Sequence, residues 1–132
     1  MSNLTITNND SGNVVLEGAV FEDELLVFGG AGTVVEGTIL ARVTASGKMT
    51  PYVIGGSLGA EIPTEVLNYD VTATGAGDVP IRGMVSGVVV EERLIVDADG
   101  DGSNLTPAIL DQLRSMSIVS QSVKELNILD NQ

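Results

Sequence analysis

The sequence contains no cysteine, no histidine and no tryptophan among its 132 residues. Without cysteine the chain can form no disulfide and offers no thiol nucleophile, so nothing in it fixes a redox compartment. Without histidine it lacks the commonest general base, and with both residues missing it lacks the usual ligands of zinc. These absences remove most familiar catalytic constellations and predict that the protein needs no cofactor.

Basic residues are also scarce, six against eighteen acids, which gives a formal net charge of −12. Binding to nucleic acid depends on basic side chains that displace the counterions of the phosphates, so we expect no nucleic-acid partner. The same charge disfavours an anionic membrane surface. No apolar run approaches the roughly 20 residues of a membrane span, and no basic-then-apolar leader is present. We therefore expect no membrane association.

Few enzyme classes stay open. A serine–lysine arrangement would have to use Lys48 or Lys124, the only two lysines, and paired-carboxylate hydrolysis could use any two of the acids. Since acids outside a motif are usually surface residues, we predict that the chain is not an enzyme.

What the chain does contain is typical of β structure. Eighteen valines, sixteen glycines and only four aromatic residues favour short strands joined by tight turns, around one modest core. We expect a mainly β domain with one or two short helices.

Residues 37–52 carry the clearest β-hairpin pattern. Residues 38–44 are mostly β-branched or aliphatic and alternate between two faces. The connection 45–47 suits a three-residue loop in which Gly47 takes a positive φ. Pro51 cannot donate to a ladder, so the returning strand is expected to end there or to lie at a sheet edge. The hairpin holds no reactive group and is interpreted as scaffold.

Further strands are expected over residues 19–28, 65–69, 79–90 and 118–123. Within the first, the three acids 22–24 predict an exposed bend or a solvated edge, because three carboxylates are costly to bury. In the third, glycines alternate with apolar residues, which indicates close approach of a neighbouring backbone or a bend. Residues 91–94 suggest a single helical turn.

One longer helix is expected after residue 106. Thr106 is a good N-cap and Pro107 a favoured first-turn residue. Apolar residues then recur along one helical face, at Ile109, Leu110, Leu113 and Met116.

Residues 1–18 are polar and irregular, with two short β-prone patches. One interpretation is a frayed terminus, as most domains have. The other is an arm that adds a strand to the sheet edge of another chain. On the second interpretation the contacting residues would be Leu4, Ile6, Val14, Val15 and Leu16.

Residues 97–102 match the first half of a calcium-binding loop. Asp97, Asp99 and Asp101 stand at positions 1, 3 and 5, and a glycine follows at position 6. The twelfth position, where a bidentate glutamate is required, holds Ala108, and the preceding segment is strand-like. We interpret the segment as a solvated acidic loop near a helix N-terminus and expect no saturable calcium site below millimolar concentration.

The order of these segments resembles that of the lambda-type phage head decoration proteins. The resemblance is carried by the hairpin of residues 37–48, by residues 66–80 with their Asp70-Val71 step, and by residues 85–94. The helix from Pro107 and the strand after it also fall in the expected places. The resemblance covers residues 19–123. It departs from the family at the acidic segment 97–102 and in the extension 125–132.

The resemblance implies a compact domain of the small β-barrel or β-tulip type, over residues 19–132 with a loose tail from about residue 126. It implies a homotrimer without enzymatic activity, made in the host cytoplasm and bound to the outer surface of the virion capsid. There it would contact the major capsid protein at three-fold and quasi-three-fold sites of the expanded head and stabilise it against the pressure of packaged DNA. Residues 1–18 would be the flexible capsid-binding arm.

A different class of function stays open beside this one. The half-motif at residues 97–102, in a chain without cysteine, would also fit a calcium-stabilised β module of a secreted or surface adhesin.

Overall fold

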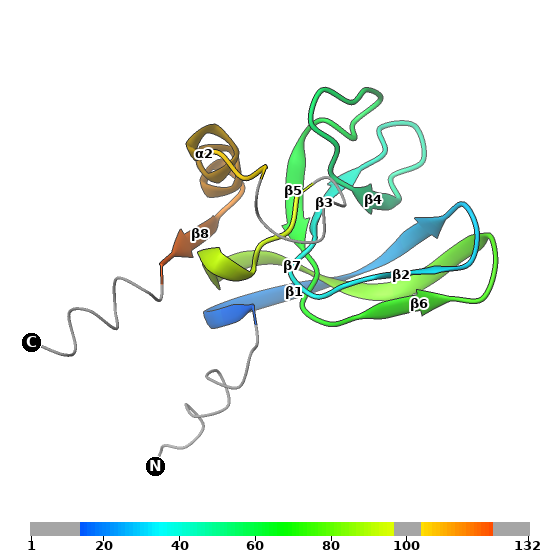
Figure 1. Cartoon of the computed structure of the whole chain (residues 1–132), viewed down its shortest axis with the longest axis horizontal. Helices are drawn as coiled ribbons and strands as arrows, with labels where there is room; N and C mark the ends of the chain where they lie inside the picture. Colours follow the sequence, from blue (N-terminus) through cyan, green and yellow to red (C-terminus); the bar gives the residue numbers. More distant parts are fainter. Residues whose placement is uncertain (1–13, 97–103, 123–132) are drawn as a thin grey trace, which may run out of the picture.

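A computed structural model describes residues 14–96 and 104–122 of the chain (Figure 1). The described residues form β strands, one 3-10 turn and one α-helix. In chain order the elements are β1 (Val15–Phe28), β2 (Gly32–Val34), β3 (Ile39–Arg42), β4 (Met49–Pro51), β5 (Pro63–Val66), β6 (Val71–Ala73), β7 (Gly77–Val90), η1 (Glu91–Arg93), α2 (Pro107–Ser115) and β8 (Ile118–Gln121). The expected mainly β fold is confirmed.

Five strands close into a small barrel. The sheet runs β1-β4-β3-β5-β7-β8, and β1 also pairs with β7, which closes the ring β1-β4-β3-β5-β7. The long antiparallel pair β1–β7 crosses the lower half of Figure 1, with β2 and β6 beside its right-hand end. The joins β1–β4 and β5–β7 are short, with a single residue pair in register each, Leu26↔Met49 and Val66↔Met84. Backbone pairing alone therefore closes this barrel weakly at two places.

Strand β3 separates two hydrophobic clusters. Ile39 and Ala41 belong to one cluster, which also contains Ile109 and Leu113 of α2. Leu40 belongs to the other, with Leu26 of β1 among its members. Both faces of this strand are buried because α2 covers one side of the sheet while the closed barrel covers the other. The alternation predicted for the hairpin is correct, and both of its faces are interior.

The hairpin turn follows its sequence closely. Gly47 has φ +74° and its N–H donates to the carbonyl of Val43, while the N–H of Val43 donates to Lys48. Strand β4 ends at Pro51, as expected.

The helix prediction is confirmed at its N-terminus. The Thr106 side chain accepts a hydrogen bond from the N–H of Ile109, and Pro107 opens the helix. The single turn η1 and the last strand β8 also lie within the predicted segments. Within residues 14–96 and 104–122, no helix combines the length and the apolar character needed to cross a membrane.

The first strand begins earlier than predicted. We expected it at Ala19, but β1 starts at Val15, and Val14 before it is fully buried. The carbonyl of Val14 accepts from the N–H of Val90, and its own N–H donates to Glu36 Oε2 at 2.7 Å. Residues 14–18, which we assigned to the arm, therefore belong to the folded sheet.

This placement predicts that Val14→Ala lowers the free energy of unfolding by about 2 kcal/mol, because two buried methyl groups are lost and a cavity is left. Val20, which is 53% exposed on the same strand, supplies the control. Val20→Ala should change stability by no more than about 0.5 kcal/mol. Urea unfolding of both variants measures the difference. Equal effects of the two substitutions would mean that Val14 belongs to the arm and not to the folded sheet.

Candidate functional site

The most unusual group in the structure is a buried acid, Glu65 on β5. Its side chain is 1% exposed. Glu65 pairs directly with Leu40 of β3 and stands two residues before Leu67, so period-two alternation points it toward the second hydrophobic cluster. A carboxylate in such a place requires partners, because an isolated buried charge is very costly.

Arg42 of β3 supplies the positive charge. Its Nη2 atom lies 3.1 Å from Glu65 Oε2 and 2.9 Å from Glu24 Oε2. Its Nη1 atom donates to Glu24 Oε1 at 3.0 Å and to the carbonyl of Gly47 at 2.8 Å. The two bonds to Glu24 form the parallel, bidentate arrangement that gives guanidinium–carboxylate pairs their strength. The hairpin turn is thus tied to the same cluster.

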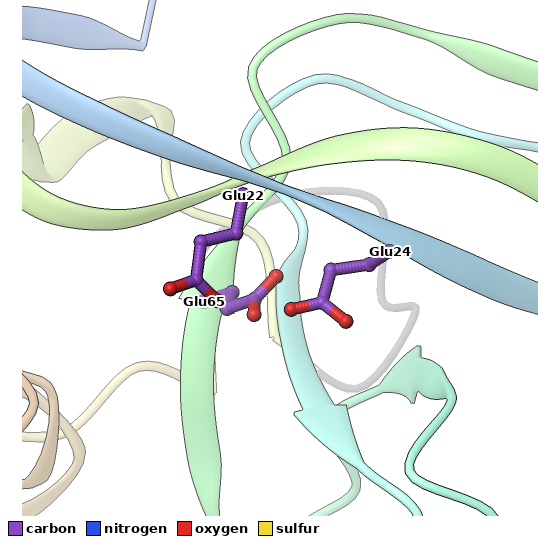
Figure 2. A group of neighbouring side chains, drawn as sticks. All are labelled: Glu22, Glu24 and Glu65. Atoms are coloured by element: carbon purple, nitrogen blue, oxygen red, sulfur yellow. The ribbon is translucent and has the colours of Figure 1, made fainter.

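A third acid faces this group. Glu22, Glu24 and Glu65 each place a carboxylate oxygen within 4.8 Å of the other two. Figure 2 shows the three side chains extending below the crossing of β1 and β7, with Glu22 and Glu24 coming from β1 and Glu65 between them. We define Glu22, Glu24, Arg42 and Glu65 as the carboxylate cluster. Fully ionised, it would carry three negative charges against one positive charge.

The cluster relieves this imbalance by holding a proton. Burial, followed by the hydrogen bond and the negative charge of Glu24, raises the pKa of Glu65 to about 8. Hydrogen bonding to Arg42 instead lowers the pKa of Glu24, against the opposing effect of its own burial. At neutral pH the pair therefore contains a neutral Glu65 and an ionised Glu24.

Gly83 of β7, which faces Glu65, explains how the Glu65 side chain fits. A Cβ atom on Gly83 of β7 would lie 1.9 Å from Glu65 Oε1. Oε1 has no hydrogen-bond partner among the described residues. The expected close approach of a backbone along β7 is confirmed at Gly87, where a Cβ atom would lie 2.9 Å from the Cα atom of Ala19, whereas at Gly83 the neighbour is a side chain.

This chemistry favours a structural role. Three carboxylates could hold a cation, but Arg42 already binds two of them, Glu24 and Glu65, and Glu65 prefers a proton. The bonds of Arg42 instead join β1 to β3 and β5, and β1 and β3 are not neighbours in the barrel. The carboxylate cluster therefore links β1 to β3 and β5, two strands with which β1 has no direct pairing.

The sequence analysis did not predict this cluster. Residues 22–24 were expected to form an exposed bend or edge, but β1 runs through them without interruption and the Glu24 side chain is only 10% exposed. That expectation was wrong for Glu24, because Arg42 of the non-neighbouring strand β3 binds its carboxylate. A basic residue between the apolar residues of the hairpin was the one available signal.

The predicted binding residues divide into two groups. Val14, Val15 and Leu16 lie at the start of the folded sheet, and Val15 pairs with Val89. Leu4 and Ile6 lie outside the described residues, as do Asp97, Asp99 and Asp101 of the calcium half-motif. Neither the capsid contacts nor the calcium prediction is tested by the described part of the chain.

The comparison with protein families connects this fold to a function. Residues 3–118 match the family model described as bacteriophage lambda head decoration protein D. The chain belongs to this family of head decoration proteins. A search of curated proteins gave no match. The family match begins at residue 3, sixteen residues before the position where we placed the start of the resemblance, and it ends at the first residue of β8. It identifies a phage capsid decoration protein, from a family that is typically non-enzymatic.

The raised pKa of Glu65 predicts a characteristic pH dependence for this decoration protein. Between about 4.3, the ordinary pKa of glutamate, and about 8, the folded state holds a proton that the unfolded chain releases. Stability should therefore fall as pH rises through this window. In Glu65→Gln, whose neutral amide resembles the protonated acid, that decline should be absent, leaving the variant more stable than the parent by at least about 1 kcal/mol at pH 9.

Urea unfolding at several pH values between 5 and 9 measures this difference. Glu17→Gln, an exposed change of the same charge on β1, is the control and should follow the parent curve. Parallel curves for Glu65→Gln and the parent would show that Glu65 ionises normally.

The close approach at Gly83 predicts a second stability effect. Gly83→Ala should cost about 1–3 kcal/mol, because the new methyl group meets the Glu65 carboxyl and forces it off its bond to Arg42. Gly75→Ala, with open space around it, should be neutral or slightly stabilising. Thermal unfolding compares them. An equal effect at both sites would mean that β7 moves aside without loss.

Proposed function

We propose that this head decoration protein is a structural, non-enzymatic cement that binds the outside of the expanded phage head as trimers. It occupies three-fold and quasi-three-fold sites, contacts the major capsid protein and stabilises the shell against the pressure of packaged DNA. The match of residues 3–118 to the head decoration family carries this proposal. The protein is made in the host cytoplasm and functions on the virion surface.

The trimer provides the affinity that a small contact lacks. Each arm offers only a short segment to the coat protein, but three arms on one body bind together, and the effective concentration of the second and third is high. The net charge of −12 keeps a crowded outer shell soluble and repels stray nucleic acid.

The arm is proposed to consist of residues 1–13, with Leu4 and Ile6 as its apolar contacts. The boundary is moved from residue 18 because Val14 is fixed in the sheet by both of its backbone groups. Such an arm adds a strand to an edge of the coat protein through main-chain hydrogen bonds, and its alternate side chains fill pockets. Val15 and Ser120 both pair with Val89, so the sheet begins and ends at the same end of the domain.

Deletion of residues 1–13 should leave the domain folded and trimeric but weaken binding to expanded capsids at least about tenfold, because the main-chain contacts of the arm are lost. Co-sedimentation with expanded and unexpanded capsids measures binding, and light scattering measures the oligomeric state.

A second test of the arm replaces two of its residues and keeps its full length. The pair Leu4→Asp and Ile6→Asp should weaken binding nearly as much as the deletion. Asn3→Asp with Asn8→Asp adds the same charge at polar positions and should have a smaller effect. If the chain that lacks residues 1–13 bound expanded capsids as tightly as the parent, the proposed role of the arm would be wrong.

A further inference from the structure

Val14 is the residue at which residues 1–13, the proposed arm, join the folded domain. Strand β1 begins directly after it, at the left-hand end of the β1–β7 pair in Figure 1. The side chain of Val14 is fully buried, and its carbonyl accepts from the N–H of Val90 at 2.8 Å. Its own N–H donates to Glu36 Oε2 at 2.7 Å instead of to β7. The junction between arm and domain is therefore bound by a side chain 22 residues further along the chain.

The backbone that carries the Glu36 carboxylate is fixed by contacts that do not involve the arm. The N–H of Glu36 donates to Asp70 Oδ1 at 2.8 Å. At the next residue, the N–H of Gly37 donates to the carbonyl of Leu67 at 2.8 Å, and its carbonyl accepts from the N–H of Ile95 at 2.9 Å. Three segments far apart in the sequence thus hold residues 36–37.

Steric contact at Gly37 fixes the same loop further. Gly37 has φ +95°, a conformation that favours glycine, and a Cβ atom there would lie 2.0 Å from the carbonyl oxygen of Arg93. The loop therefore packs directly on the backbone of η1. Because its backbone is held in this way, the Glu36 carboxylate is an acceptor already in place for the N–H of Val14.

The bond between Glu36 and Val14 determines where the mobile part of the chain can begin. A hydrogen bond from a backbone N–H to a carboxylate is roughly twice as strong as one between neutral groups. Without the carboxylate, the N–H of Val14 would have only water as a partner, and a strand end that loses its bonds opens first. The point at which the arm is fixed would then move into β1.

A moving junction would weaken an arm that becomes ordered on its partner. Each further residue that must be ordered on binding adds a cost in conformational entropy. A longer mobile segment also lowers the effective concentration of one arm once another arm on the same body is bound. A fixed junction at Val14 keeps both costs small.

We propose that Glu36 is a positioning residue for the capsid-binding arm: its carboxylate holds the N–H of Val14, so that the arm leaves the domain at one fixed residue. Glu36 acts through Val14 and needs no contact with the coat protein. The inference rests on the arm of the proposed function, but the bond itself can be tested without capsids.

Hydrogen exchange measured by nuclear magnetic resonance tests the bond. In Glu36→Ala the N–H of Val14 should exchange at least about tenfold faster, and that of Val90 should follow, while that of Ile39, bonded to Ile95, should not change. Glu36→Gln keeps a side-chain oxygen as acceptor and should restore most of the protection. Glu17→Ala removes the same charge from an exposed position of β1 and should have no effect. Faster exchange at Ile39 as well, or at none of these amides, would overturn the proposal.

Co-sedimentation with expanded capsids tests the role of the bond in binding. Glu36→Ala should weaken binding at least about threefold, whereas Glu36→Gln and Glu17→Ala should bind like the parent. The same substitution is then made in the Leu4→Asp, Ile6→Asp chain, which keeps the N–H of Val14. There Glu36→Ala should weaken binding no further, because the apolar contacts of the arm are already lost.

Two outcomes of the binding experiment would contradict different proposals. Equal losses from Glu36→Ala in both chains would mean that Glu36 acts through the body of the domain, which would overturn its positioning role alone. If the Leu4→Asp, Ile6→Asp chain itself bound like the parent, the arm of the proposed function would be wrong, and the positioning role of Glu36 would be wrong with it.

Discussion

The fold depends on the guanidinium group of Arg42, which links three strands of a small barrel. The joins β1–β4 and β5–β7 each have a single residue pair in register, so the ring is closed weakly by its backbone. Arg42, whose side chain is 41% exposed, binds acids on β1 and β5, strands that are not neighbours in the ring. Because Glu65 is buried, removing Arg42 would leave an acid in the interior without its partner, which costs more than the pair contributes. Its use here is to specify which strands meet, a task that apolar side chains perform less selectively.

The proton on Glu65 completes this arrangement. With all three acids ionised beside one arginine, the carboxylate cluster would hold two uncompensated negative charges close to Leu26 and Leu40. A neutral Glu65 can donate to Glu24 while it accepts from Arg42, so both hydrogen bonds survive without the extra charge. Gly83 leaves the space that the carboxyl needs. The carboxylate cluster is thus a device for closing the fold, built from residue types that would suggest catalysis in another setting.

Local sequence patterns were enough to predict the turn and the helix start, whereas the burial of the charged residues depends on contacts between residues far apart in the sequence. Gly47 and Thr106 could be assigned because a turn and a helix start are set by their immediate neighbours. The burial of Glu24 and Glu65 could not, because their partner lies 18 and 23 residues away across a closed ring. Val14 was missed for a similar reason: its bonds to Glu36 and Val90 are invisible in a polar, irregular stretch of sequence. The candidate site was therefore the least predictable part of the fold.

Energetically unfavourable features in the interior and at the surface differ in whether neighbouring residues compensate them. Inside, two costly features have a local compensation: Glu65 has Arg42 and a proton, and the tight approach at position 83 has a glycine. Among residues 14–96 and 104–122 nothing covers the Leu58 side chain in this way, since it stays exposed while its backbone is held in an unfavourable conformation.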